Sequence, residues 1–182
     1  GAVEVLVLDE SSNPVGDAAL FARRADGTLV DSLSWALTGQ DGRATYSGLE
    51  PGRYTISARS ERLASPLNGT QVDVQAGETL RIEQRVADAT RLVVTTADAE
   101  GKKTRASYIV ENADGLQVQR MQSLDELRRA VAGGGFALLE ASFGPLPPGR
   151  YRVTATGPDG RTVTKPVKLS GQEERRMTLR LR

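Results

Sequence analysis

The stretch Pro51-Gly52-Arg53-Tyr54, which continues as Thr-Ile-Ser-Ala, recurs at Pro148-Gly149-Arg150-Tyr151, which continues as Arg-Val-Thr-Ala. The two copies begin 97 positions apart in a chain of 182 residues. Proline and glycine favour a turn, and the tyrosine opens a run of alternating apolar and polar residues, as in a half-buried strand. The motif therefore predicts two β-rich domains in tandem. In each, we expect the tyrosine hydroxyl to tie the connection that precedes the strand, as a corner tyrosine does.

A second set of matches indicates that the two copies differ in length. Residues 3–8 match residues 91–96 as opening strands, and Asp26-Gly27 matches Asp114-Gly115, both at an offset of 88. The offset then changes from 88 to 97, a difference of nine. We therefore expect an insertion of that size in the second copy, between its Asp-Gly turn and its Pro-Gly turn.

The inserted segment has the pattern of a short helix over residues 123–132. Ser123 and Glu126 have the spacing of a capping box, in which the two side chains satisfy unpaired amides of the first turn. Apolar residues follow at helical spacing, and three glycines at 133–135 end the pattern. Because this segment makes the copies unequal, we expect any specialised surface to lie there.

Turn dipeptides punctuate the rest of the chain. Glycine accepts positive φ, and the Asp or Asn before it bonds to the local backbone. These dipeptides are Asp26-Gly27, Asp41-Gly42, Asn68-Gly69, Asp114-Gly115 and Asp159-Gly160. Short alternating runs between them are typical of a sandwich. We predict an all-β chain of two tandem Greek-key β-sandwiches, at residues 1–87 and 88–182, with one short helix near 123–132 inserted in the second.

The first copy carries a series of motifs in a fixed order after its opening strand: Asn13-Pro14-Val15-Gly16-Asp17-Ala18, Gln40-Asp41-Gly42-Arg43-Ala44-Thr45-Tyr46, Gly48-Leu49-Glu50-Pro51-Gly52-Arg53-Tyr54 and Ala76-Gly77-Glu78. This series resembles the carboxypeptidase regulatory-like domain, a transthyretin-like (prealbumin-like) sandwich common in bacterial envelope and secreted proteins. The second copy lacks the Asp-Gly-Arg turn, so it resembles a divergent member. The resemblance implies a periplasmic, cell-surface or extracellular location, but motifs of turn chemistry identify no functional site.

Composition excludes several classes of function. The chain has no Cys and no His, which removes thiol nucleophiles, Cys/His zinc sites and imidazole acid–base chemistry. Lys and Arg total 24 against 23 Asp and Glu, so the net charge of +1 gives no general attraction for nucleic acid. No apolar run approaches the roughly 18 residues of a membrane-spanning helix. The start of the sequence, without Met or a signal-peptide pattern, reads as that of an excised fragment.

Few side chains remain as candidate ligand contacts. Trp35, Tyr46 and Tyr108, with Phe143, are the aromatic residues that could stack on a sugar ring or a peptide, although a core or rim position is the favoured interpretation of Trp35. Single acidic residues such as Asp9, Glu10, Asp26, Asp31, Asp41 and Asp73 do not form a calcium-binding run. We therefore expect no catalytic residue, no metal and no cofactor.

Two functions from different classes fit these observations. The first is a noncatalytic structural, adhesion or protein-docking module of a larger bacterial envelope or extracellular protein. Its partner would be another protein or other domains of the same parent chain, without nucleic acid and without membrane insertion. The alternative is a carbohydrate-binding accessory module of a multidomain enzyme, with a glycan as the partner.

Overall fold

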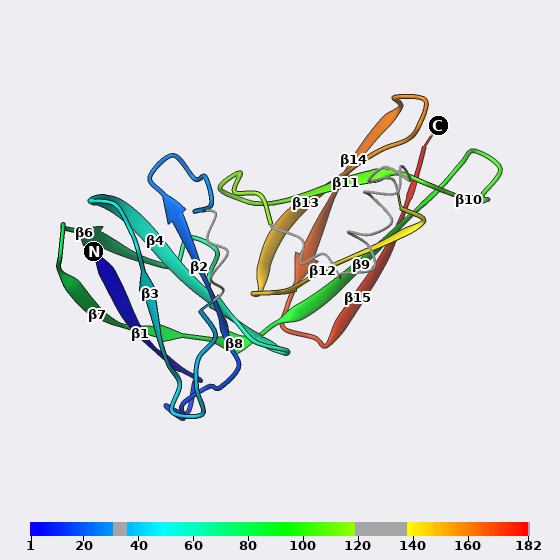
Figure 1. Ribbon diagram of the computed structural model, residues 1–182. Coiled ribbons are helices and arrows are strands. Elements are labelled where there is room, and N and C mark those ends of the chain that lie inside the picture. The colour runs from blue at the N-terminus through cyan, green and yellow to red at the C-terminus, as the bar shows by residue number, and fades with distance from the viewer. Residues whose placement is uncertain (31–35, 119–137, 182) are drawn as a thin grey trace. The chain divides into compact units, whose positions relative to one another are not determined.

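The computed structural model describes residues 1–30, 36–118 and 138–181 (Figure 1). In these ranges all regular secondary structure is β, so the prediction of an all-β chain is confirmed. The helix predicted near 123–132 lies outside the described residues. The chain divides into two compact units, Gly1–Ala89 and Thr90–Arg182. We call them unit 1 and unit 2 and describe each by itself.

Unit 1 contains two sheets. Its strands are β1 (Ala2–Leu8), β2 (Ala19–Arg24), β3 (Arg43–Ser47), β4 (Gly52–Arg59), β5 (Leu63–Ala64), β6 (Thr70–Val74), β7 (Thr79–Arg85) and β8 (Ala87–Asp88). In the first sheet β1 is central, antiparallel to β3 and parallel to β7. In the second sheet β4 is flanked by β2 on one edge and by β6 and the short β5–β8 pair on the other.

The core of unit 1 draws side chains from both sheets. Val3, Val5 and Val7 of β1 are fully buried, as every second residue of a half-exposed strand should be. They belong to one cluster with Tyr54 and Ile56 of β4 and with buried residues of β2 and β6. Side chains from both sheets thus form one hydrophobic core, although the unit contains few aromatic residues.

Unit 2 repeats this plan. Its strands are β9 (Thr90–Ala97), β10 (Lys103–Thr104), β11 (Ser107–Asn112), β12 (Glu140–Leu146), β13 (Gly149–Thr156), β14 (Thr162–Leu169) and β15 (Glu174–Arg180). The first strand, β9, lies between the antiparallel β12 and the parallel β15. The other sheet has the order β11-β13-β14, which corresponds to β2-β4-β6 of unit 1. The pairing of six strands is therefore the same in both units.

The strand registers correct the repeat alignment by one residue. Val3 of β1 faces Tyr46, and Leu92 of β9 faces Phe143. Tyr46 and Phe143 are themselves 97 positions apart, so Val3 corresponds to Leu92, at an offset of 89 rather than 88. The offset of 88 was wrong for this strand, because a slip of one residue would exchange the buried face with the exposed face.

Isolated bridges show where unit 2 is longer. Leu29 bridges to Arg23 of β2, and Gln117 bridges to the equivalent Glu111 of β11. Leu37 bridges to Ala19, whereas Leu138 bridges to Ala106, one residue before the position equivalent to Ala19. Leu29 and Leu37 are eight positions apart, and Gln117 and Leu138 are 21 positions apart. After Leu138, unit 2 enters β12 two residues later, whereas unit 1 makes the Asp41-Gly42 turn before β3. From Leu29 to the start of β3 at Arg43 are 14 positions, and from the equivalent Gln117 to the start of β12 at Glu140 are 23, which gives the net insertion of nine.

Candidate functional site

The aromatic residues predicted as ligand contacts do not form a common surface. Trp35 lies outside the described residues. Tyr46 is only 5% exposed and belongs to the core of unit 1, and Phe143 is 2% exposed in unit 2. Their rings therefore offer no face for stacking. The alternation of Arg43, Thr45 and Ser47 with inward residues was a signal for burying Tyr46.

Tyr108, the remaining candidate, is half-buried in β11 and takes part in an internal network. Its hydroxyl lies 3.1 Å from Oγ1 of Thr96 and donates a longer bond of 3.4 Å to the carbonyl of Leu138. Thr96 in turn donates to the carbonyl of Thr104 at 2.7 Å. Thr96 occupies the position of Val7 in unit 1, so unit 2 replaces an apolar core residue by a polar one. The sequence reasoning did not single out Thr96.

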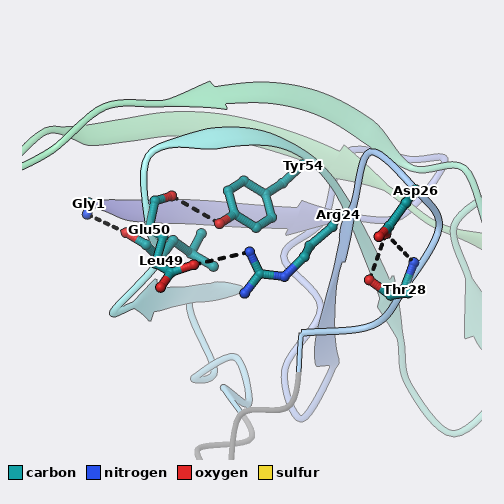
Figure 2. A network of polar contacts seen from close by, with 7 residues as sticks. All are labelled: Gly1, Arg24, Asp26, Thr28, Leu49, Glu50 and Tyr54. Atoms are coloured by element: carbon teal, nitrogen blue, oxygen red, sulfur yellow. Dashed lines mark hydrogen bonds and ion pairs between the residues drawn. The ribbon is translucent and has the colours of Figure 1, made fainter.

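A network of polar contacts lies at the β3–β4 corner of unit 1 (Figure 2). Tyr54 is 2% exposed, and its hydroxyl donates to the carbonyl of Glu50 at 2.9 Å. The amine of Gly1 donates to the carbonyl of Leu49 at 2.6 Å, and Gly48 has a φ of +79°. The corner is held through main-chain carbonyls, so these contacts close a turn.

A charged pair covers this corner. Arg24 Nη1 lies 3.2 Å from Oε2 of Glu50, and its Cζ lies 5.9 Å from the centre of the Tyr54 ring (Figure 2). Arg24 and Tyr54 are direct neighbours in the β2–β4 register. Because the side chains of Arg24 and Glu50 are 45% and 74% exposed, the pair contributes less than about 1 kcal/mol. No nucleophile and no paired acid and base result from this arrangement.

Unit 2 has the same corner with a different neighbour. The hydroxyl of Tyr151 donates to the carbonyl of Pro147 at 2.7 Å, again four residues upstream. The prediction that the Pro-Gly-Arg-Tyr tyrosines tie their connections is therefore confirmed in both units. In the register, Asn112 takes the place of Arg24 beside the tyrosine. Its Oδ1 accepts the amides of Asp114 and Leu116, at 3.0 and 2.8 Å, and so closes the adjacent turn.

The acidic residues with shifted pKa values belong to turns. Hydrogen bonds from the amide and side chain of Asn13 lower the pKa of Asp9, and those from Thr28 lower the pKa of Asp26. The Arg161 side chain lowers the pKa of Asp159. All three carboxyls are solvent-exposed and favour the ionised form, which is the opposite of a proton donor poised near neutral pH. In the described ranges no group of three or more potential ligands could hold a metal ion.

Ion pairs cross the outer faces of the two β1- and β9-centred sheets. In unit 1, Glu4 on the central strand binds Arg43 of β3 at 3.0 Å and Arg81 of β7 at 3.1 Å. In unit 2, Arg176 of β15 reaches Glu140 of β12 at 3.7 Å. These contacts tie three neighbouring strands together. They act on the fold.

The closing strand follows its predicted pattern. Leu179 and Leu181 are buried and Met177 is half-buried, whereas Arg176, Thr178 and Arg180 are exposed. This confirms a half-exposed strand in place of a continuous basic surface. No helix in the part of the chain that the structure describes is long and apolar enough to cross a membrane.

No family model and no curated protein matches the sequence. Solved structures that resemble the chain include the Bacillus anthracis TIE protein, at 17% identity and a TM-score of 0.37 over 99% of this chain and 33% of that one. A second is BcpA, the major pilin subunit of Bacillus cereus, at 10% identity and a TM-score of 0.38 over 99% of this chain and 98% of that one. A third is GBS52, the minor pilin of Streptococcus agalactiae, at 12% identity and a TM-score of 0.40 over 98% of this chain and 94% of that one. The chain spans a third of the first structure's length. TM-scores this low establish neither family nor function.

Proposed function

We propose that the chain is a noncatalytic structural module of a larger bacterial envelope or extracellular protein. It consists of two tandem prealbumin-like sandwiches divided near residue 88, and the first is a carboxypeptidase regulatory-like domain. One observation carries this proposal: the same pairing of six strands occurs twice in succession, and each copy is closed by the same tyrosine corner. Repetition of a rigid fold is how chains build spacers and extended surfaces.

The polar chemistry of the described residues supports a structural role. Its strongest contacts close turns, as Asp26 does with Thr28, or cross strands, as Glu4 does between two arginines. The carboxyls with shifted pKa values are held ionised on the surface. Their hydrogen bonds stabilise the shape of the loops.

The sheet edges indicate how a protein partner would dock. β14 is the edge strand of its sheet and carries Lys165 in the core-facing row, opposite the buried Val153, followed by Pro166. An inward-pointing charge and a proline discourage the addition of another strand. At this edge the partner, another protein or another domain of the same parent chain, would therefore bind loops or a sheet face instead of adding a strand.

The carbohydrate-binding alternative receives no specific support from the described residues, because Tyr46 and Phe143 are buried and the Tyr108 hydroxyl is engaged internally. The single tryptophan provides its test. We expect the fluorescence of Trp35 in the full chain to stay constant across a panel of polysaccharides. A saturable change with one of them would favour the accessory-module function over the structural one.

The structural role is tested by exchanging units in the protein that carries this chain. Residues 90–182 are replaced by a second copy of Gly1–Ala89, which preserves the strand plan but not the surface of unit 2. We expect the function of the parent protein to survive this exchange and to be lost when a Gly/Ser linker of equal length is used instead, because only the linker is flexible. Loss of function in a folded exchange variant would contradict the proposal and indicate a binding surface specific to unit 2.

A further inference from the structure

The first and last strands of each unit lie side by side and run in the same direction. β1 pairs with β7 over seven register positions, from Ala2 opposite Thr79 to Leu8 opposite Arg85. β9 pairs with β15 over seven positions as well. We call these two parallel pairs the terminal clamps. They were not predictable from local motifs, because 77 positions separate Ala2 from Thr79.

The geometry points to a further function: each unit is built to transmit tension along the chain. A pull on the ends of unit 1 draws the beginning of β1 and the end of β7 in opposite directions. Because the strands are parallel, these two points lie at opposite ends of the clamp, and the pull is directed along the strands. The hydrogen bonds of the clamp are then strained together. Had the strands been antiparallel, the same pull would have opened them one bond at a time.

Both clamps are bounded by the same main-chain hydrogen bonds. In unit 1 the amide of Ala2 donates to the carbonyl of Glu78 at 2.8 Å, and the amide of Val86 donates to the carbonyl of Leu8 at 2.9 Å. In unit 2 the equivalent bonds run from Arg91 to Glu173 at 3.0 Å and from Leu181 to Ala97 at 2.9 Å. The pairing therefore extends one residue past each end of the register, and the repeat has preserved it at both ends.

Side chains reinforce each clamp on both faces. Glu4 and Arg81 cross the β1–β7 clamp at 3.1 Å, and the hydroxyls of Thr95 and Thr178 cross the β9–β15 clamp at 2.9 Å. On the inner face, Val3, Val5 and Val7 of β1 and Leu92 and Val94 of β9 are fully buried. Sliding β1 past β7 would break the outer contacts and expose the inner ones at the same step, which raises the barrier to forced unfolding.

The two clamps are joined in series by the chain itself. Unit 1 ends at Ala89 and unit 2 begins at Thr90, so tension that leaves one clamp enters the next after a few residues. Tension applied to the C-terminal end of unit 1 acts first on the two-residue β8, which pairs with β5, and then on β7. This inference deepens the proposed structural role, on which it rests, because it states the load that the spacer would carry.

The test is the direction dependence of the unfolding force, measured on single molecules. The chain has no cysteine, so two added cysteines define the pulling points without ambiguity. One variant carries a cysteine ahead of Gly1 and Asp88→Cys, which strains the clamp of unit 1 along the strands. Its matched control carries the same first cysteine and Glu78→Cys, which pulls the two strands apart from one end. Asp88 and Glu78 are both exposed, and equal urea midpoints verify that the variants are equally stable.

We expect the first variant to unfold at a force at least about twofold higher than the control, because seven paired positions resist together instead of in turn. We also expect the full chain, pulled by its ends, to lengthen in two steps of at most about 300 Å each, one for each unit of roughly 90 residues. Equal forces in the two directions, or a higher force in the control, would overturn the inference. The pulling experiment does not determine the outcome of the unit exchange, so the mechanical function and the proposed structural role are tested separately.

Discussion

Removing the hydroxyl groups of the corner tyrosines should destabilise the two units by different amounts. Tyr54→Phe and Tyr151→Phe keep the buried rings and delete the bonds from the hydroxyls to the carbonyls of Glu50 and Pro147. A typical hydrogen bond contributes about 1 kcal/mol, and a buried acceptor left unpaired costs about 1–3 kcal/mol. The Tyr151 bond is shorter, at 2.7 Å against 2.9 Å, and is buried, whereas the Tyr54 bond is part-buried and open to replacement by water. We expect losses of about 1 kcal/mol for Tyr54→Phe and about 2–3 kcal/mol for Tyr151→Phe.

Urea unfolding of the full chain measures both losses. Trp35, the only tryptophan, belongs to unit 1, so its fluorescence follows that unit, while far-ultraviolet circular dichroism follows both. In thermal unfolding, each 1 kcal/mol corresponds to a shift of about 4–8 °C for a unit of this size. Tyr54→Phe should shift the fluorescence transition, and Tyr151→Phe should shift the dichroism transition by more. Losses below about 0.3 kcal/mol in both variants, or a larger loss for Tyr54→Phe, would refute the assignment of the corner bonds as closures of the fold.

Three further changes test other parts of the structure. Thr90 is fully buried and its hydroxyl has no hydrogen-bond partner among the described residues, so Thr90→Val should raise the free energy of unfolding by about 1 kcal/mol. Thr90→Ser, which keeps the hydroxyl, should lower it, and a less stable valine variant would contradict this. A Cβ at Gly69 would collide with the Ile56 carbonyl, whereas one at Gly77 meets nothing within 4 Å, and both glycines have positive φ. Gly77→Ala should therefore lower the free energy of unfolding by about 1 kcal/mol, and Gly69→Ala should lower it by at least about 3 kcal/mol. Equal losses would argue against the close approach of Gly69 to Ile56. Because the pKa values of the turn aspartates are lowered in the folded state, their ionised carboxyls stabilise the fold at pH values above the ordinary pKa of 3.8. This contribution disappears as the pH falls through the folded-state pKa values, so Asp26→Asn should flatten the decline in melting temperature with acid. An unchanged decline would show that the Asp26 turn does not contribute to the acid dependence of stability.

The sequence predicted the features that depend on local turn chemistry. Pro-Gly-Arg-Tyr indicated both the turn and the corner, because the proline, the glycine and the tyrosine hydroxyl all act within a few residues of one another. It also indicated the all-β class. The sequence did not predict which face of the opening strand of unit 2 is buried. Leu92, Val93 and Val94 are all buried there, so this strand lacks the clear alternation of apolar and polar residues that β1 has. The alignment error of one residue came from that run.

The contacts that join distant segments were beyond sequence reasoning. Thr96 reads as a polar residue near a strand end, and only the fold places its hydroxyl against Tyr108 and the Thr104 carbonyl. The parallel pairing of first and last strands likewise depends on which edges remain free after the antiparallel pairs have formed. Trp35 as a ligand contact and the helix near 123–132 remain predictions, since both lie outside the described residues.

The central claim is that each unit is closed by its own first and last strands, and amide hydrogen exchange on the intact chain tests it most directly. The amides of Val86 and Leu181 donate to Leu8 and Ala97 at the ends of the two clamps. We expect both to exchange as slowly as the central β4 and β13 amides, because only unfolding of the whole unit exposes them. Exchange of Val86 and Leu181 as fast as that of the exposed turn amide of Lys102 would contradict the claim.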